Sequence, residues 1–101
     1  MRKKTLLIAY DIASPARLGR VHRRLKKVAI PVQYSIFITR LDPRKLKQLI
    51  MELKMLIDAK EDDVRIYELP EQFEVKLLGR QQLPEGITLQ LGGLERMLQQ
   101  P

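Results

Sequence analysis

Hydrophobic residues recur with helical spacing in two segments of the chain. The first segment follows Ser14 and Pro15, a hydroxyl suited to cap a helix and a proline suited to its first turn. Its apolar stripe consists of Leu18, Val21, Leu25 and Val28. The second segment follows Asp42 and Pro43, and its apolar stripe consists of Leu46, Leu49, Ile50, Leu53, Leu56 and Ile57. Both patterns predict amphipathic helices with one face turned towards a core.

Short apolar or alternating runs between and after these helices predict strands. Thr5 to Tyr10 is apolar on both faces, which is typical of a buried strand. Val32 to Thr39 alternates and is rich in β-branched and aromatic residues, so it predicts one continuous strand. Further strands are expected at Val64 to Leu69, Phe73 to Leu78 and Ile87 to Leu91.

Strands on either side of two amphipathic helices predict a two-layer α/β sandwich, with one sheet and both helices on one face. In the first strand, Leu6 and Ile8 point one way, whereas Leu7 and Ala9 point the other. Two helices cover only one of these apolar faces. A second copy of the chain is the most economical cover for the other face, and we therefore expect a homodimer.

The charge of the chain is concentrated in one segment. The formal net charge is +7, and residues 12–41 hold seven basic residues and no acidic one. The remaining 12 basic and 12 acidic residues balance. A localised basic patch favours a polyanion such as nucleic acid as the partner, and the alternative is a helix whose charges serve solubility.

Composition excludes several other classes of site. The chain has no cysteine, which excludes disulfides and thiolate metal ligands, and its single histidine, His22, excludes a multi-histidine metal site. We expect His22 to be an exposed side chain of the first helix. No apolar run is long enough for a signal or membrane segment, so we expect a cytoplasmic protein with no membrane partner.

Basic residues form a stripe along the first predicted helix. Arg17, Arg20, Arg24 and Lys27 recur at spacings of three, four and three. Arg17 lies in the first turn, where the helix dipole disfavours a cation, and a bound phosphate would relieve that conflict. This stripe is the candidate nucleic-acid contact.

Asp11 is the candidate for metal chemistry. It follows the buried strand directly and is the only acidic residue among the first 41. Magnesium in proteins is typically held by one or two carboxylates together with water and phosphate oxygens. A twofold axis that paired Asp11 with the Asp11 of a second copy would supply two carboxylates. The alternative is an acid that pairs with a neighbouring arginine or caps a turn.

Three motifs in order resemble the CRISPR-associated Cas-two family, the small subunit of CRISPR adaptation. They are Tyr10-Asp11-Ile12 at the end of the first strand, Gln33-Tyr34-Ser35-Ile36-Phe37 after the basic helix, and Val64-Arg65-Ile66-Tyr67 after the second helix. The resemblance implies a ferredoxin-like βαββαβ fold with a hairpin in the Val32 to Thr39 region and an extra C-terminal strand. The ferredoxin-like domain would span residues 1–80. In the extension 81–101, Ile87 to Leu91 would join the sheet of the partner in a homodimer.

The same resemblance implies a function in antiviral defence. The protein would partner the CRISPR integrase subunit during capture of new DNA. It would also hydrolyse RNA or double-stranded DNA as an endonuclease that depends on magnesium, or alternatively manganese. Asp11 matches the metal ligand and catalytic aspartate, with Tyr10 beside it.

The nucleic-acid contacts implied by the resemblance add to the basic stripe. They are Arg17 and Arg20 at the helix start and Ser35 and Phe37 in the strand motif; an aromatic strand residue such as Phe37 is alternatively a core residue. Two alternatives to the nuclease remain open. One is a non-catalytic scaffold that bridges DNA, and the other is a ferredoxin-like RNA-binding module or toxin-type ribonuclease.

Overall fold

The computed structural model describes residues 2–73, which form six elements in the order βαββαβ. The elements are β1 (Lys4–Asp11), α1 (Pro15–Lys26), β2 (Ile30–Gln33), β3 (Ile36–Leu41), α2 (Pro43–Leu56) and β4 (Asp63–Leu69). Both predicted helices and the first and third predicted strands are confirmed to within a few residues. Apart from Phe73, the strands expected at Phe73 to Leu78 and Ile87 to Leu91 lie outside the described residues, as does the extension 81–101.

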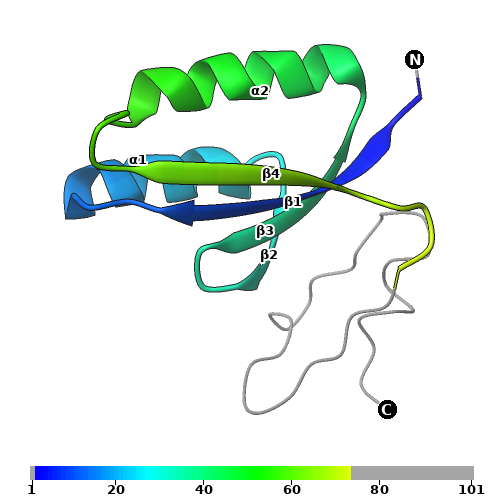
Figure 1. Ribbon diagram of the computed structural model, residues 1–101, viewed down its shortest axis with the longest axis horizontal. Helices are drawn as coiled ribbons and strands as arrows, with labels where there is room; N and C mark the ends of the chain where they lie inside the picture. Colours follow the sequence, from blue (N-terminus) through cyan, green and yellow to red (C-terminus); the bar gives the residue numbers. More distant parts are fainter. Residues whose placement is uncertain (1, 74–101) are drawn as a thin grey trace.

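The four strands form one antiparallel sheet in the order β2-β3-β1-β4. Figure 1 shows both helices on the same side of this sheet. The predicted two-layer sandwich is therefore confirmed, and the strand order is that of the ferredoxin-like fold. Neither helix within residues 2–73 is long and apolar enough to cross a membrane.

The prediction of one continuous strand from Val32 to Thr39 is wrong. The segment is a hairpin in which Tyr34 and Ser35 form the turn between β2 and β3. Ser35 has a φ of 68°, a left-handed conformation that turns of this kind usually assign to glycine or asparagine. Because neither residue type occurs there, the sequence has no turn signal. The hairpin agrees with the topology that the family resemblance implied.

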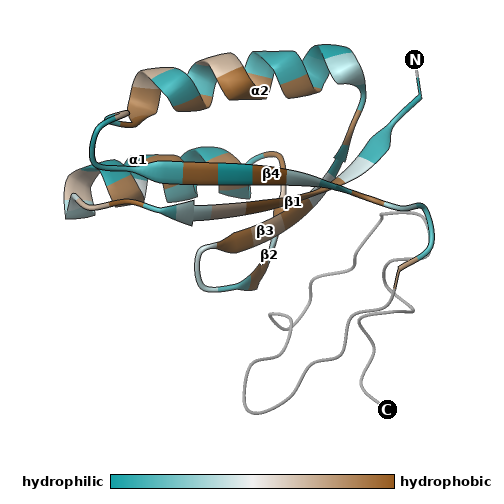
Figure 2. Cartoon of the chain, viewed as in Figure 1, coloured by the Kyte–Doolittle hydropathy of each residue, from teal (hydrophilic) through white to brown (hydrophobic). Residues whose placement is uncertain are grey.

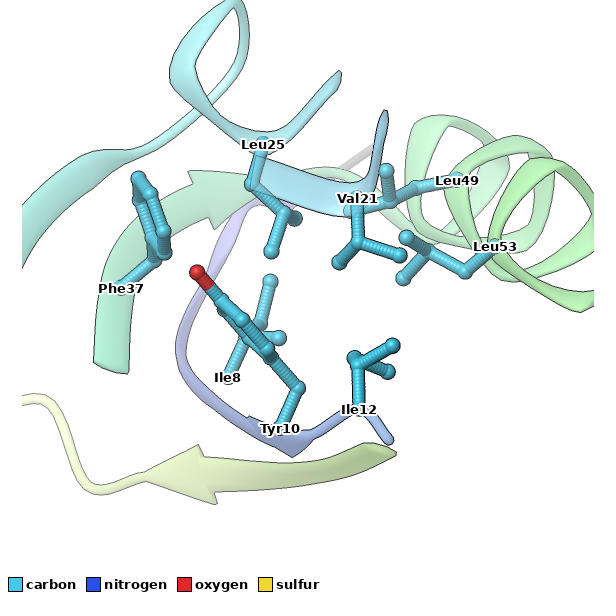
Figure 3. Close-up of a cluster of buried hydrophobic side chains, with 8 residues drawn as sticks. All are labelled: Ile8, Tyr10, Ile12, Val21, Leu25, Phe37, Leu49 and Leu53. Atoms are coloured by element: carbon cyan, nitrogen blue, oxygen red, sulfur yellow. The ribbon is translucent and has the colours of Figure 1, made fainter. Parts of the chain in front are cut away.

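The core lies between the sheet and the two helices (Figure 3). Its buried side chains come from β1 and the residue after it, α1, β3 and α2, and they are Ile8, Tyr10, Ile12, Val21, Leu25, Phe37, Leu49 and Leu53. The predicted stripes of both helices supply four of these side chains. Figure 2 shows the corresponding alternation of hydrophobic and hydrophilic residues along α2.

Both helix starts follow the caps expected from the sequence. Ser14 Oγ accepts a hydrogen bond of 3.3 Å from the Arg17 amide, and Asp42 Oδ1 accepts one of 2.8 Å from the Lys45 amide. Each cap is followed by a proline in the first turn. These caps satisfy amide groups that have no partner within the helix, which fixes where each helix begins.

The face of the sheet that points away from the helices is apolar at its centre and carries charged residues around that centre, among them Arg40, Asp11, Asp63 and Arg65. Alternation along the paired strands assigns to it Leu7 and Ala9 of β1, Ile36 and Ile38 of β3, and Tyr67 of β4. Tyr67 is 48% exposed, Leu7, Ala9 and Ile36 are partly exposed, and Ile38 is already buried. We call this surface the open face. Its composition agrees with the two-sided apolar pattern of the first strand.

Candidate functional site

Two aspartates lie directly opposite each other at one end of the sheet. In the register of β1 and β4, Asp11 pairs with Asp63, and both side chains are exposed. Paired residues share a face, and their Cβ atoms are typically about 5 Å apart. Since Tyr10 and Ile12 are buried under the helices, Asp11 and Asp63 point to the open face. Arg65 Nε donates a hydrogen bond of 2.9 Å to Asp63 Oδ2.

The turn between β2 and β3 lies beside Asp11. The Tyr10 amide donates a hydrogen bond of 3.1 Å to the carbonyl oxygen of Ser35. Ser35, a predicted nucleic-acid contact, is thus brought to the end of the sheet that carries Asp11 and Asp63. Tyr34 beside it is 74% exposed. The hairpin therefore places polar groups at the end of β1 that carries Asp11.

Asp62, the residue before Asp63, is fully buried as a side chain. Its Oδ1 accepts hydrogen bonds from the Ala13 amide at 2.9 Å and Arg17 Nη2 at 3.2 Å. Its Oδ2 accepts hydrogen bonds from Arg17 Nε at 2.8 Å and the Asp58 amide at 2.8 Å. The bonds from Arg17 are the largest cause that holds the pKa of Asp62 far below its usual range. Asp62 is therefore an anion with donors around both oxygens.

Arg17 and Arg24, two members of the predicted basic stripe, are already paired with carboxylates. Arg17 contacts Asp62 and, at 3.4 Å, Glu61. Arg24 forms a forked contact with Glu52 of α2, with 3.0 Å between Nη2 and Oε1. The anion expected at the start of α1 is thus present, but it is the chain's own Asp62. The conflict between Arg17 and the helix dipole is therefore met by a carboxylate that arrives from 45 residues further along the chain, and a phosphate contact by Arg17 stays a prediction.

Within residues 2–73, the cations of α1 and its C-terminal cap that lack a carboxylate partner are Arg20, Arg23, Lys26 and Lys27. All four are exposed. They belong to the helical layer (Figure 1), whereas strand alternation turns Asp11 and Asp63 to the open face on the other side of the sheet. Arg20 and Lys27 remain candidate nucleic-acid contacts, and Arg23 joins them.

Tyr10 and Phe37 are core residues, contrary to their predicted roles. Tyr10 is 6% exposed and Phe37 is completely buried, with their ring centres 6.1 Å apart (Figure 3). The Tyr10 hydroxyl lies 3.0 Å from His22 Nδ1, at hydrogen-bond distance, and burial raises the pKa of this phenol. Strand alternation turns Tyr10 away from the face that carries Asp11. Phe37 consequently has no surface to offer a base, and Tyr10 does not point towards Asp11.

The expectation for His22 is also wrong. His22 is half-buried, and its ring meets the edge of Phe37 with 5.3 Å between ring centres. The side chain of this residue therefore packs against the sheet.

The two carboxylates fit a magnesium ion that completes its shell with water and phosphate oxygens. Oxygen donors suit this hard cation, which is often bound through only one or two carboxylates. Within residues 2–73, no group of three or more histidine, cysteine, aspartate or glutamate residues is arranged to hold a metal. A closed site made by protein side chains alone is therefore absent from this part of the chain. Asp11 and Asp63 are the residues that could hold an ion in an open site, completed by water and phosphate oxygens.

Asp62 and Asp63 were missed by the sequence analysis. The signal for them is the acidic run Glu61-Asp62-Asp63 immediately before the third predicted strand. Nothing in that run indicates which acid is buried or which faces Asp11. The register between β1 and β4 decides both.

The chain matches the family model described as "CRISPR associated protein Cas2" over residues 4–76. It is 49% identical over 81 residues to CRISPR-associated endoribonuclease Cas2 1 of Nitrosomonas europaea, covering 80% of this chain and 77% of the relative. It is 40% identical over 84 residues to CRISPR-associated endoribonuclease Cas2 2 of Thermodesulfovibrio yellowstonii, covering 82% and 92%. A relative from Thermus thermophilus, CRISPR-associated endonuclease Cas2 2, is 38% identical over 85 residues, covering 84% and 92%.

Solved structures give the same result. A crystal structure titled as Cas2 aligns with a TM-score of 0.74 at 30% identity, covering 86% of this chain and 99% of the other. A hypothetical protein from Thermus thermophilus aligns with a TM-score of 0.73 at 35% identity, covering 82% and 99%. The family model extends over β1 to β4 and thus over the whole arrangement around Asp11. The chain belongs to the Cas2 family of CRISPR-associated proteins.

Proposed function

We propose that this protein is a magnesium-dependent endonuclease of CRISPR adaptation. In this proposal it acts as a homodimer, cleaves RNA or alternatively double-stranded DNA, and partners the CRISPR integrase subunit. The observation that carries the proposal is the position of Asp11 directly opposite Asp63 on the open face. The names of the relatives as endoribonucleases or as an endonuclease support the same activity.

Asp11 and Asp63 are the residues that would hold magnesium, or manganese in its place. A bound ion of this kind polarises the scissile phosphate and lowers the pKa of a bound water. Arg65, through its bond to Asp63, holds one carboxylate in place and reduces the repulsion between the two. Ser35 offers a hydroxyl and a backbone turn beside Asp11, suited to positioning a phosphate.

The homodimer is supported by the open face. The apolar side chains of the open face surround the strand that ends at Asp11, and a second copy of the chain would cover them. Because Asp11 points to the same side, a twofold axis through this face would bring the site of each protomer towards that of its partner. A phosphodiester would then lie between two sets of carboxylates.

A non-catalytic scaffold is the second candidate, and the exposed cations of α1 favour it. Arg20, Arg23 and Lys27 lie in the helical layer, away from Asp11, and so would bind phosphates without bringing them to the carboxylates. A dimer would display two such helices, as a subunit that bridges DNA requires. Membership of the Cas2 family supports both candidates over the toxin-type ribonuclease and the unrelated RNA-binding module.

Substitution of Asp11 by asparagine tests the catalytic proposal. Asp11→Asn preserves shape but removes the charge, so cleavage of single-stranded RNA and of duplex DNA should fall at least about a hundredfold. Glu68→Gln is the control, because Glu68 is an exposed acid on β4 at the opposite end of the sheet. EDTA should stop the wild type, and added magnesium should restore it.

Two results would contradict the catalytic proposal. If Asp11→Asn cleaves as fast as the wild type in a preparation free of contaminating nuclease, Asp11 has only a structural role. If neither protein cleaves either substrate with magnesium or manganese, the scaffold is the remaining candidate.

A further inference from the structure

We propose that Arg17 is a positioning residue: by holding Asp62, it fixes the loop after Asp11 against the segment before Asp63. The inference rests on the proposed function, in which Asp11 and Asp63 hold the metal. It replaces the role of phosphate contact that the position of Arg17 at the start of the helix suggested.

Asp62 joins the two chain segments that carry the carboxylates. It directly precedes Asp63, and its Oδ1 accepts the amide hydrogen of Ala13, two residues after Asp11. The same side chain accepts the Asp58 amide, which closes the loop between α2 and β4. A single buried carboxylate thus connects the end of β1, the start of β4 and the loop before it.

Arg17 supplies the charge that keeps this carboxylate buried. Nε and Nη2 of Arg17 approach the two oxygens of Asp62 at 2.8 Å and 3.2 Å, a forked arrangement available to guanidinium and unavailable to ammonium. An ionised carboxylate without such donors is costly to bury. Without Arg17, Asp62 would therefore be expected to leave its buried position.

The end of the sheet needs this contact because Asp11 and Asp63 repel each other. Like charges directly opposite each other destabilise an antiparallel pair, and here they form the last pair between β1 and β4. The bonds of Asp62 lie immediately beyond that pair. These bonds hold the end of β1 and the start of β4 together at the place where the repulsion between Asp11 and Asp63 would favour separation of the strands.

A phosphate contact by Arg17 would compete with these bonds. Two of its three guanidinium nitrogens are engaged by Asp62, and Nη2 also lies 3.4 Å from Glu61. Arg20, one turn further along α1, is exposed and has no carboxylate partner within residues 2–73. The two arginines of the same helix are therefore a matched pair for experiment.

Nucleic-acid binding without metal separates the two roles. In EDTA, Arg20→Ala should flatten the dependence of log affinity on log salt by about 2 for a dimer that loses two phosphate contacts, and Arg17→Ala should leave that slope unchanged. An equal change of slope for Arg17→Ala would overturn the proposal, because Arg17 would then contact phosphate. This binding measurement does not depend on nuclease activity.

Cleavage kinetics test the positioning itself. Arg17→Lys and Asp62→Asn should each lower kcat about tenfold to a hundredfold with KM unchanged, and the double variant should lose no more than either single one. Glu68→Gln, which breaks an ion pair with Lys4 between the same two strands at the far end, should leave kcat unchanged. The proposal would be overturned if the losses of kcat in the two single variants multiplied in the double variant. It would also be overturned if the variants had lower thermal stability but a normal kcat.

Manganese binding measured by electron paramagnetic resonance, without nucleic acid, distinguishes this inference from the proposed function. If the wild type binds manganese, both variants should bind it more weakly, and equal affinity would count against positioning. If the wild type neither binds manganese nor cleaves, the proposed function fails, and with it the claim that Arg17 positions metal ligands. In that case the salt dependence of nucleic-acid binding in EDTA still decides whether the bonds to Asp62 prevent Arg17 from contacting phosphate.

Discussion

Asp11 and Asp63 face each other across β1 and β4 with their side chains on the same face of the sheet. Only Asp63 has a cationic neighbour among the described residues, through the bond from Arg65. A protein that places like charges opposite each other loses stability at that position. In this chain the residues that lower the stability are the ones proposed to hold a metal. Such a loss of stability in favour of function is typical of functional sites.

Removing one of these charges should therefore stabilise the protein while it abolishes cleavage. Asp11→Asn is expected to raise the free energy of unfolding by about 0.2–1 kcal/mol in the absence of metal, since it removes the repulsion with Asp63. Urea unfolding in EDTA measures this effect. A less stable variant would indicate that Asp11 has a structural partner.

Acid should destabilise the protein through Asp62. The pKa of Asp62 is lowered by Arg17 in the folded state, so its contribution is present at neutral pH. That contribution is lost as the pH falls below about 4, the usual value for an unfolded aspartate, towards the folded value. Asp62→Asn should be less stable than the wild type by a constant amount from pH 7 down to about pH 4, and the difference should shrink as the pH falls further. A difference that stays constant below that pH as well would exclude ionisation as the source.

The open face should mediate dimerisation. Leu7→Asp introduces a charge among the apolar side chains of β1 and β3, so it should convert the dimer into a monomer. Sedimentation at micromolar concentration should give about twice the chain mass of 11.8 kDa for the wild type and the single mass for the variant. Met55→Asp is the control, because Met55 is 86% exposed on α2, in the other layer. If the wild type sedimented as a monomer, a site shared between two protomers would be excluded as well.

The exposed cations of α1 should account for the salt sensitivity of nucleic-acid binding. If a dimer makes about six phosphate contacts, the slope of log affinity against log salt should be near −5. Substituting alanine at both Arg20 and Arg23 removes four cations from a dimer and should flatten the slope by about 3 to 4. Titration at several salt concentrations gives the slope directly. An unchanged slope would assign these residues to solubility.

Gly19 offers a test of α1 that is independent of function. A methyl group at Gly19 would lie 3.1 Å from Nη1 of Arg23, the far end of a flexible and exposed side chain. Arg23 can move aside, so Gly19→Ala should raise the free energy of unfolding by about 0.5–1 kcal/mol through helix propensity. Thermal unfolding provides the measurement. A lower free energy of unfolding would mean that the packing of Arg23 over Gly19 stabilises the fold by more than the helix propensity of alanine adds.

The sequence by itself determined the elements whose signals are local. The caps at Ser14 and Asp42 and the helical stripes located α1 and α2, because capping and amphipathic spacing act within one or two turns. The two-sided apolar pattern of β1 likewise indicated the open face. Asp11 was identified from its place after a buried strand, and the structure leaves it exposed at that strand's end.

Only the tertiary structure decided what depends on strand register and distant partners. The turn at Tyr34 and Ser35 was hidden because serine rarely adopts a positive φ, and the hydrogen bond from the Tyr10 amide to the Ser35 carbonyl ties this turn to β1. The burial of Tyr10 and Phe37 under the helices followed from which strand face met the core. Arg17 met Asp62, and Asp11 met Asp63, across 45 and 52 residues of chain, because antiparallel pairing of β4 with β1 brings those segments together. Charge counted along the sequence cannot reveal such neutralisation, since ion pairs form between residues that are close in space.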